Sequence, residues 1–342
     1  MFDFYRDIAG LALLHSRLVA SDVMWQAKAS ATAHTSGLLG PRSPAKMRLM
    51  RAAFIASPYY HSVAASLQFD ESLTLQTALA AQGVTLDIVN GLATDVDWGR
   101  YDVVLPLGLW GYHKDPAAFC TFITALEQRG VRLANAGKVL RWNLDKAYLL
   151  DLQRLGVTIA PLQHFPVGSR IDLGKELQDA GYTRYVLKPT ISANALQTFV
   201  GEGPPSAPLQ AEAEQILQHS GLLLQPFFDE ILDTGELSLV FFGHKYSHTV
   251  VKVPKAGDFR SQPSHGAHVT ALQPSAQVLA QAQAVVAAAV QHTGCPLVYA
   301  RVDGFVRDGQ LFLVELELIE PYLFLAEGGP ASVQQLCGAL SP

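Results

Sequence analysis

Acidic residues alternate with leucine in one apolar segment near the C-terminus. Residues 314–320 read VELELIE, which places Glu315 and Glu317 two residues apart. Because successive side chains of a strand point to opposite faces, both carboxylates are expected on one face, with Leu316 and Leu318 on the other. The segment therefore predicts a strand that carries paired acids.

A third acid is expected beside that pair. Asp303 lies inside another apolar segment, and a turn at residues 308–309 (Asp-Gly) predicts a hairpin between the two strands. Asp303, Glu315 and Glu317 would then share a face and repel one another unless a cation lies between them, and carboxylates are the ligands that Mg²⁺ prefers. A solvated face without a ligand is the alternative, since acids often alternate on half-exposed strands.

Two lysines stand in unusual places. Lys188 ends an apolar strand and precedes the small residues 190–195, which allow backbone N–H groups to approach an anion. A helix is predicted over residues 143–155, with Asn143 as its N-cap. Lys146 would lie in the first turn, where the helix dipole disfavours a cation unless an anion also binds. Each lysine alone is equally compatible with an ordinary surface position.

A basic loop completes the set of charged residues. Lys252, Lys255 and Arg260 lie in KVPKAGDFRSQ, between two predicted strands. Cations that meet phosphate oxygens, opposite acids that hold a metal, are what a magnesium–nucleotide site needs. No P-loop pattern is present, so the phosphates would be held in another way.

The elements that must position these residues fall into two patterns. Strands and helices alternate through the first part, which predicts a layered α/β domain with a parallel sheet, and strands dominate after residue 222. The predicted strands are 52–57, 84–89, 102–106, 131–134, 157–160, 184–188, 222–228, 237–242, 247–253, 298–306 and 311–318, and the predicted helices are 73–81, 116–128, 143–155, 210–219 and 276–291.

Composition excludes several classes of protein. The chain has 342 residues, 49 % of them hydrophobic and 16 % charged, which is typical of a globular enzyme and not of a disordered chain. The net charge is −5 without a basic block, so neither nucleic acid nor a membrane is expected as a partner. The three cysteines show no metal-binding spacing, which favours a reducing, cytoplasmic location.

Residues 1–46 differ from the rest. They combine a short apolar stretch with a segment rich in Ala, Ser, Thr, Gly and Pro. We interpret them as an N-terminal extension and linker. The alternative is a chain whose translation begins at Met47 or Met50.

Taken in order, these motifs resemble the ATP-grasp superfamily. The resemblance covers about residues 50 to 330 and is carried by RWNLDKAYLLDL, KVPKAGDFRSQ, YARVDGF and VELELIEP. It is greatest to the branch of glutathione synthetase and ribosomal-protein glutamate ligase, and within it to the cycloserine-pathway cyclo-ligase and its uncharacterised relatives. It implies a pre-ATP-grasp α/β domain at 47–140, then a two-subdomain ATP-grasp fold of mixed α/β and α+β class. The lid subdomain would span 141–224 and the catalytic subdomain 225–342.

The resemblance also implies a role for each residue of the site. Lys146 and Lys188 would bind ATP phosphates, and the hinge of residues 225–228 would bind adenine through its backbone. Glu236 would bind the ribose. The catalytic cations would be Lys252 and Arg260, the ATP-contacting hinge residues Gln225, Phe227 and Phe228, and the Mg²⁺ (or Mn²⁺) ligands Asp303, Glu315 and Glu317.

The implied activity is that of an ATP-dependent carboxylate–amine ligase or cyclo-ligase. It would activate a small-molecule carboxylate as an acyl phosphate and couple it to an amine or another nucleophile. A homodimer is compatible with this activity. Residues 107–113 depart from the pattern, because the cyclo-ligase branch carries an Arg and an Asp around the Trp and this chain has neither. A substrate other than that of cycloserine synthesis is therefore expected.

Two other activities stay open from the sequence. One is a regulatory, non-catalytic ATP-binding module. The other is a phosphotransferase that stops at a phosphorylated product.

Overall fold

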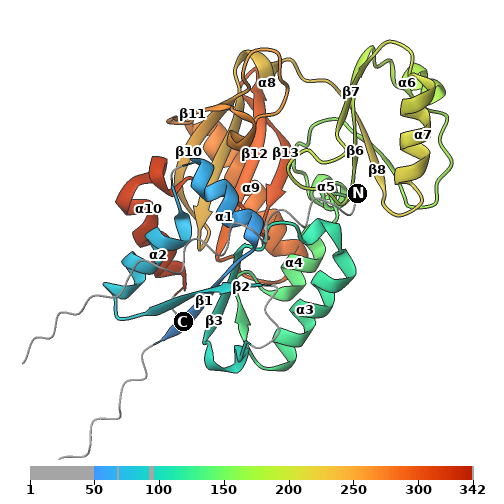
Figure 1. The fold of residues 1–342 in the computed structure, drawn as a ribbon. Helices are drawn as coiled ribbons and strands as arrows, with labels where there is room; N and C mark the ends of the chain where they lie inside the picture. Colours follow the sequence, from blue (N-terminus) through green and yellow to red (C-terminus); the bar gives the residue numbers. More distant parts are fainter. Residues whose placement is uncertain (1–49, 68, 92–95, 341–342) are drawn as a thin grey trace, which may run out of the picture. The chain divides into compact units, whose positions relative to one another are not determined.

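The computed structural model describes residues 50–67, 69–91 and 96–340, all within one compact unit (Figure 1). The interpretation of residues 1–46 lies outside the described residues. Within the described chain, no helix has the length and apolarity needed to cross a membrane. Three sheets organise this unit, and each is built from consecutive strands of the sequence: β1 to β4, β5 to β8 and β9 to β13.

The first sheet is parallel, with strand order β2-β1-β3-β4. Its elements are β1 (Arg51–Ala56), α1 (Pro58–Leu67), α2 (Glu71–Ala80), β2 (Thr85–Asn90), β3 (Val103–Gly108), α3 (Pro116–Gln128) and β4 (Arg132–Leu133). Alternate residues of β1 enter two different cores: Phe54 packs with α2 and α10, whereas Ile55 packs with α3. Burial on both faces explains why the central strands are continuous apolar runs, and the predicted parallel α/β layer is confirmed.

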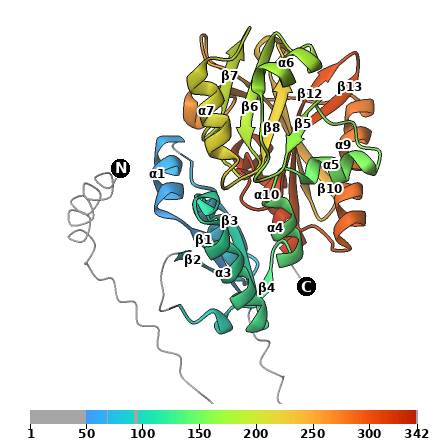
Figure 2. The same ribbon diagram turned by 90° about the vertical axis from the view of Figure 1, so that its right-hand side faces the viewer.

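The second part of the chain carries an antiparallel sheet with strand order β5-β8-β6-β7. Its elements are α4 (Gly137–Asn143), α5 (Tyr148–Arg154), β5 (Gln163–Phe165), α6 (Leu173–Ala180), β6 (Arg184–Pro189), β7 (Phe199–Glu202), α7 (Ala207–Ile216) and β8 (Leu222–Pro226). Tyr185 and Leu187 of β6 pack against α6 and α7, which cover one face of the sheet (Figure 2). Val186 and Lys188 therefore point to the other face.

Two predictions in this part are wrong. The single helix predicted over residues 143–155 is two helices, and Asn143 ends the first instead of capping the second. The Asn143 side chain is buried and bonds the backbone of Leu316 and Leu318, at 2.8 and 2.9 Å, so a tertiary contact outweighs its capping preference. The strand predicted at residues 157–160 is reduced to a single bridge between Ile159 and Leu313.

The third sheet is antiparallel, with strand order β11-β10-β9-β12-β13. Its part of the chain comprises α8 (Glu230–Asp233), β9 (Glu236–Phe242), β10 (Lys245–Val253), β11 (His268–Ala271), α9 (Ala276–Thr293), β12 (Tyr299–Arg307), β13 (Gln310–Glu317) and α10 (Leu325–Leu340). The alanine-rich α9 lies against one face, where Leu239 and Val302 meet Val285 and Ala289. The opposite face carries the charged residues of β9, β12 and β13.

A β-bulge determines which residues of β13 face the core and which face the cavity. The register with β12 pairs Asp303 with Glu315 but Gly304 with Leu313, so Val314 is the extra residue. Leu313 and Leu316 consequently both face the core beneath the sheet, although they are three residues apart. The bulge lets one strand bury leucines along its whole length and still turn Glu315 to the open face.

Asn135 joins the parallel sheet to the third sheet. Its side-chain amide donates to the carbonyls of Tyr299 and Leu318, at 3.0 and 2.9 Å, and its carbonyl accepts from the N–H of Val298 at 2.6 Å. Asn135 is fully buried. The same side-chain carbonyl accepts from the N–H of Tyr299 at 3.4 Å, so one side chain satisfies four backbone groups at this junction.

Candidate active site

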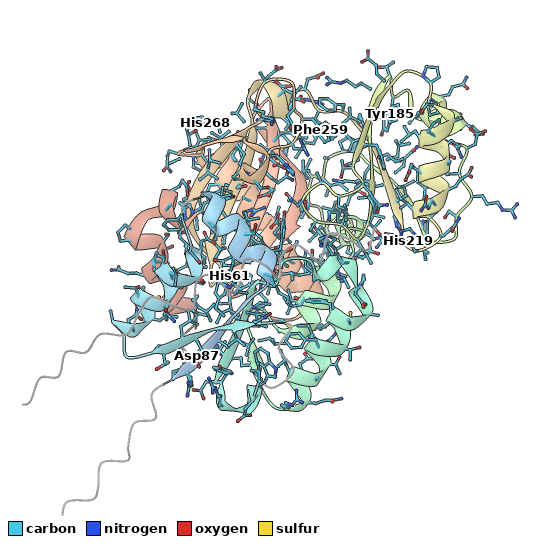
Figure 3. All side chains as sticks on the ribbon, viewed as in Figure 1. His61, Asp87, Tyr185, His219, Phe259 and His268 are labelled. Carbon is cyan, nitrogen blue, oxygen red and sulfur yellow. The ribbon has the colours of Figure 1, made fainter. Side chains whose placement is uncertain are left out.

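One cavity collects the charged residues that the sequence analysis singled out. Its walls come from the cavity-facing side of β6 and β8, the open face of β9, β12 and β13, and the loop after β10. The lining includes all eleven predicted site residues: Lys146, Lys188, Gln225, Phe227, Phe228, Glu236, Lys252, Arg260, Asp303, Glu315 and Glu317. Phe259, from the loop after β10, lies on the side of the third sheet turned toward the second sheet (Figure 3).

An arginine that the sequence analysis did not select lies at the centre of the carboxylates. Arg301 of β12 donates to Asp303 from Nε and Nη2, at 2.9 and 2.8 Å, and also contacts Glu317. Its Nη1 donates to the carbonyl of Tyr322 at 2.8 Å. Arg301 is two residues before Asp303 and thus on the same strand face, a signal that could have identified it.

Asp303 is almost fully enclosed by donors. Besides Arg301, it accepts hydrogen bonds from Ser238 Oγ at 2.7 Å and from Lys252 Nζ at 3.1 Å. Burial by itself raises the pKa of Asp303, but the charges of Arg301 and Lys252 outweigh burial and hold that pKa well below its ordinary value. Asp303 is therefore ionised at neutral pH.

Glu315 and Glu317 are more open. Their side chains are 32 % and 26 % exposed, against 4 % for Asp303. Burial and the neighbouring carboxylates of Asp303 and Glu315 raise the pKa of Glu317, although Arg301 opposes this rise. A further cation beside Glu317 would relieve the repulsion between these acids.

Lys146 links the second sheet to the acids. It lies in the turn between α4 and α5, and its Nζ is 3.2 Å from Glu315. The same ammonium donates to the carbonyl of Ser192, and the Lys146 N–H donates to the carbonyl of Thr190 at 2.9 Å. The lysine is therefore fixed by the loop that follows β6, and it lies just before α5 instead of in the first turn of a helix as predicted.

Lys188 has no such partner. Its side chain is buried in the cavity wall, and burial lowers the pKa of its ammonium. Among the described residues the Lys188 ammonium forms no hydrogen bond or ion pair. The charges of Glu315 and Glu236 oppose this lowering of the pKa, but neither acid pairs with Lys188 directly, so its ammonium is available to an anionic ligand.

Lys252 and Glu236 form a second buried pair. Lys252 Nζ lies 2.7 Å from Glu236, and Ser261 Oγ also donates to Glu236. Burial lowers the pKa of Lys252, but the charges of Asp303 and Glu236 together raise it above its ordinary value. In this arrangement Glu236 is turned to Lys252, so a ribose would compete with that ion pair.

Arg260 is held within its own loop. Its guanidinium donates to Asp258 from Nε and Nη2, at 2.9 and 2.8 Å, and its side chain stays 36 % exposed. The Arg260 side chain pairs with none of the cavity carboxylates among the described residues. The guanidinium is partly exposed, so a ligand that enters the cavity would have to compete with Asp258 for it.

The hinge has one backbone donor available. β8 ends at Pro226, two residues earlier than predicted. The Phe227 N–H donates to the carbonyl of Arg184 at 2.9 Å, whereas the Phe228 N–H donates to no atom of the described residues. The Arg184 guanidinium lies 3.6 Å from the centre of the Phe227 ring, and the Phe228 and Phe305 rings lie 4.6 Å apart.

Asn194 connects three segments around the cavity. Its amide donates to Tyr59 Oη of α1 at 2.7 Å, and its carbonyl accepts from Ser264 Oγ of the loop after β10 at 3.2 Å. Asn194 has φ of +53°, a left-handed conformation that Asn tolerates better than most residues. The sequence analysis selected the small residues around it as a phosphate loop but gave no role to its side chain.

The acids provide suitable chemistry for a divalent cation, but they are not pre-arranged around one. Among the described residues, no group of three Asp, Glu, His or Cys side chains is placed to hold a metal ion. Glu315 and Glu317 expose carboxylate oxygens to the cavity, as a hard cation requires. Asp303 is already saturated by Arg301, Lys252 and Ser238.

The fold and this site define a class of protein. The structure superposes on D-alanine–D-alanine ligase from Bacillus anthracis complexed with ATP, with a TM-score of 0.60 at 15 % identity over 85 % of this chain and 96 % of the other. It also superposes on the crystal structure of D-cycloserine synthetase DcsG, with a TM-score of 0.75 at 26 % identity over 85 % and 98 %. The predicted ATP-grasp fold is thus confirmed.

Sequence comparison gives the family. Residues 52–135 match the family described as "D-cycloserine synthetase DcsG, N-terminal domain". The chain is 30 % identical over 299 residues to the cycloserine biosynthesis protein DcsG of Streptomyces lavendulae, covering 82 % of this chain and 97 % of that protein. The chain therefore belongs to the DcsG family of the ATP-grasp superfamily, and it is an enzyme of the ATP-grasp ligase kind.

Proposed function

We propose that this ligase activates a small-molecule carboxylate as an acyl phosphate and then couples it to an amine or another nucleophile. The observation that carries the proposal is the single cavity in which Lys146, Lys188 and Arg260 face Glu315 and Glu317. Positive charge for the phosphates and negative charge for a metal meet there, and no nucleophilic side chain of the protein is required.

The chemistry proceeds in two steps. A carboxylate oxygen of the substrate attacks the γ-phosphorus of ATP, and the bond to the β-bridging oxygen breaks to release ADP. The nucleophile then attacks the acyl carbon, the C–O bond to phosphate breaks, and the nucleophile loses a proton. Both steps depend on position and charge neutralisation, to which fixed cations contribute most.

The roles follow from the surroundings of each residue. Lys188 and Lys146 would bind the α- and β-phosphates, and Arg260 would turn from Asp258 to the transferred phosphoryl group. Glu315 and Glu317 would hold Mg²⁺ or Mn²⁺, and Asp303 would join them after release from one of its present donors. The metal, when bound, would offset the charge of the phosphate oxygens.

The adenosine would be bound by the hinge and the residues next to it. The free Phe228 N–H supports adenine recognition at the end of β8. Gln225 and Phe227 would line the adenine pocket, and Glu236 would meet the ribose after release from Lys252. We further propose the domain limits 47–140, 141–224 and 225–342, and a cytoplasmic reaction, which the free thiols support.

Trapping with hydroxylamine tests the proposal. The purified protein, Mg²⁺ and ATP are incubated with a panel of amino acids and small acids, and ADP and hydroxamate are measured. We expect at least one acid to stimulate both together. ADP release with a phosphate monoester and no hydroxamate would indicate a phosphotransferase, and Mg-dependent ATP binding without turnover for any acid would indicate a regulatory module.

A further inference from the structure

Polar groups without partners gather at the end of the cavity next to the parallel sheet. Among the described residues, the carboxylate of Glu320 and the hydroxyl of Tyr112 form no hydrogen bond or ion pair, and Nδ1 of His113 is buried without a partner. All three residues line the cavity. None of them belongs to the nucleotide or metal set proposed above.

The position of Glu320 is fixed by its backbone. Its carbonyl accepts a hydrogen bond from Trp110 Nε1 at 3.0 Å, and the flanking Ile319 and Pro321 are buried. The chain therefore presents this side chain to the cavity in a defined way. An exposed surface glutamate would have no such constraint.

No cation among the described residues pairs directly with Glu320. Burial raises the pKa of Glu320 well above its ordinary value, and the charges of Glu317 and Glu315 add to this rise. The charges of Arg301 and Lys146 oppose this rise. However, the Arg301 guanidinium pairs with Glu317, and the Lys146 ammonium pairs with Glu315. A positively charged ligand group beside Glu320 would form with it the kind of ion pair that Arg301 and Lys146 form with Glu317 and Glu315.

Two aromatic residues lie beside Glu320. Trp110 donates to its carbonyl, and the charge of Glu320 is the largest electrostatic influence on the Tyr112 hydroxyl. Aromatic faces attract cations, most strongly where water is excluded. A carboxylate beside aromatic rings is thus suited to a protonated amine, whereas the lysines of the cavity are suited to phosphate.

We propose that Glu320 binds the protonated amino group of a substrate, with Trp110 and Tyr112 completing the subsite. The proposal rests on the ligase function above, because it says where the protonated amino group of one of the two substrates binds. The amino group belongs either to the acid that is activated or to the nucleophile that attacks it. Both sources present the same chemistry to Glu320, and they can be separated by experiment.

The test compares matched pairs of compounds with and without the amino group. Alanine and propionate, serine and 3-hydroxypropionate, and aspartate and succinate are each offered to the wild type and to Glu320→Gln, and ADP release is measured. We expect kcat/KM for the amino compound to fall by about 10- to 100-fold in Glu320→Gln, as loss of a charged hydrogen bond predicts. The deaminated partner should be used equally by both enzymes.

Two arms locate the amino group. With hydroxylamine as the nucleophile, a defect of Glu320→Gln toward the amino acid shows that the ammonium is on the activated acid. A defect only when the amino compound serves as nucleophile shows that it is on the second substrate. Glu327→Gln is the matched control, because Glu327 is exposed and does not line the cavity.

A binding measurement separates this inference from the ligase function. The same pairs are compared by the shift in melting temperature in the presence of Mg²⁺ and a non-hydrolysable ATP analogue. If no compound supports turnover but amino compounds stabilise the wild type and not Glu320→Gln, the amino-group subsite is supported and the ligase function is contradicted. Equal discrimination by the wild type and Glu320→Gln in both measurements would overturn the subsite.

Discussion

The Lys146 ammonium lies 3.2 Å from the Glu315 carboxylate and so joins the turn before α5 to the edge strand β13. A nucleotide phosphate and its metal would have to enter between these two groups. Lys146 is buried and Glu315 is about one-third exposed. The pair is therefore a preformed, neutral junction that a negatively charged, metal-loaded ligand can divide.

Replacing Glu315 tests the acid side of this pair. Glu315→Gln keeps the shape of the side chain and removes its charge, so we expect kcat to fall by about 100-fold or more. Acid-dependent ADP release measures it. Glu202→Gln, on the exposed end of β7, should retain wild-type activity, and an active Glu315→Gln would contradict the proposed metal role.

Lys188 should show opposite effects on activity and on stability. Its side chain is buried in the cavity wall and its ammonium forms no ion pair, so Lys188→Met should raise the free energy of unfolding by about 1 kcal/mol. The same change should raise KM for ATP by about 10- to 100-fold, since a charged hydrogen bond to phosphate is lost. Denaturant unfolding and steady-state kinetics measure the two effects. A less stable variant with unchanged KM would show that Lys188 serves the fold and not the nucleotide.

Asn194 should control how the loop after β6 is held. Asn194→Gly keeps the left-handed backbone accessible and removes the bonds to Tyr59 and Ser264. We expect a loss of about 1 kcal/mol in stability and a several-fold rise in KM for ATP. Tyr59→Phe removes one of the two bonds and should give a smaller change in the same direction. The idea fails if both variants match the wild type in KM.

Glu71 should make stability depend on pH. It is buried and accepts the N–H groups of Leu323 and Leu325, and burial raises its pKa to about 7 from an ordinary value of 4.5. The folded protein therefore holds a proton that the unfolded chain has already released, so stability falls as the pH rises from about 4.5 to 7 and then levels off. At ~1.36 kcal/mol per pH unit the loss is about 3 kcal/mol.

Glu71→Gln isolates this contribution. The variant cannot ionise, so its free energy of unfolding should lack the part of the pH slope that Glu71 supplies. Urea unfolding at pH 5, 6, 7 and 8 for both proteins gives the difference. Parallel curves would show that Glu71 stays ionised or neutral throughout and would contradict the assignment.

Periodicity predicted the elements that have strong local patterns. Helix α3 has its predicted bounds, Pro116–Gln128, and the structure shows why they are sharp: Asp115 caps it and a proline starts it. Helix α6, with its narrow apolar stripe of Leu173 and Leu177, and the short strands β5, β7 and β11 were not predicted. Segments of three or four residues carry too little pattern to separate them from loops.

The candidate site was predictable where charge interrupts an apolar strand. Asp303, Glu315 and Lys188 stood out for that reason, and the cavity brings them together. Arg301 was not selected, although it lies two residues before Asp303 on the same strand face, because only the acids of that face were considered. Nor could spacing show that Lys252 would lie between Glu236 and Asp303, since these residues meet only through the register of three strands.

Transfer of labelled oxygen tests the central claim most directly. The acid that best stimulates ADP release is prepared with ¹⁸O in its carboxylate, and the released phosphate is examined by mass spectrometry. Attack of that carboxylate on the γ-phosphorus, followed by displacement at the acyl carbon, predicts one ¹⁸O atom in inorganic phosphate. Unlabelled phosphate, or label in AMP, would show that no acyl phosphate forms and would contradict the account.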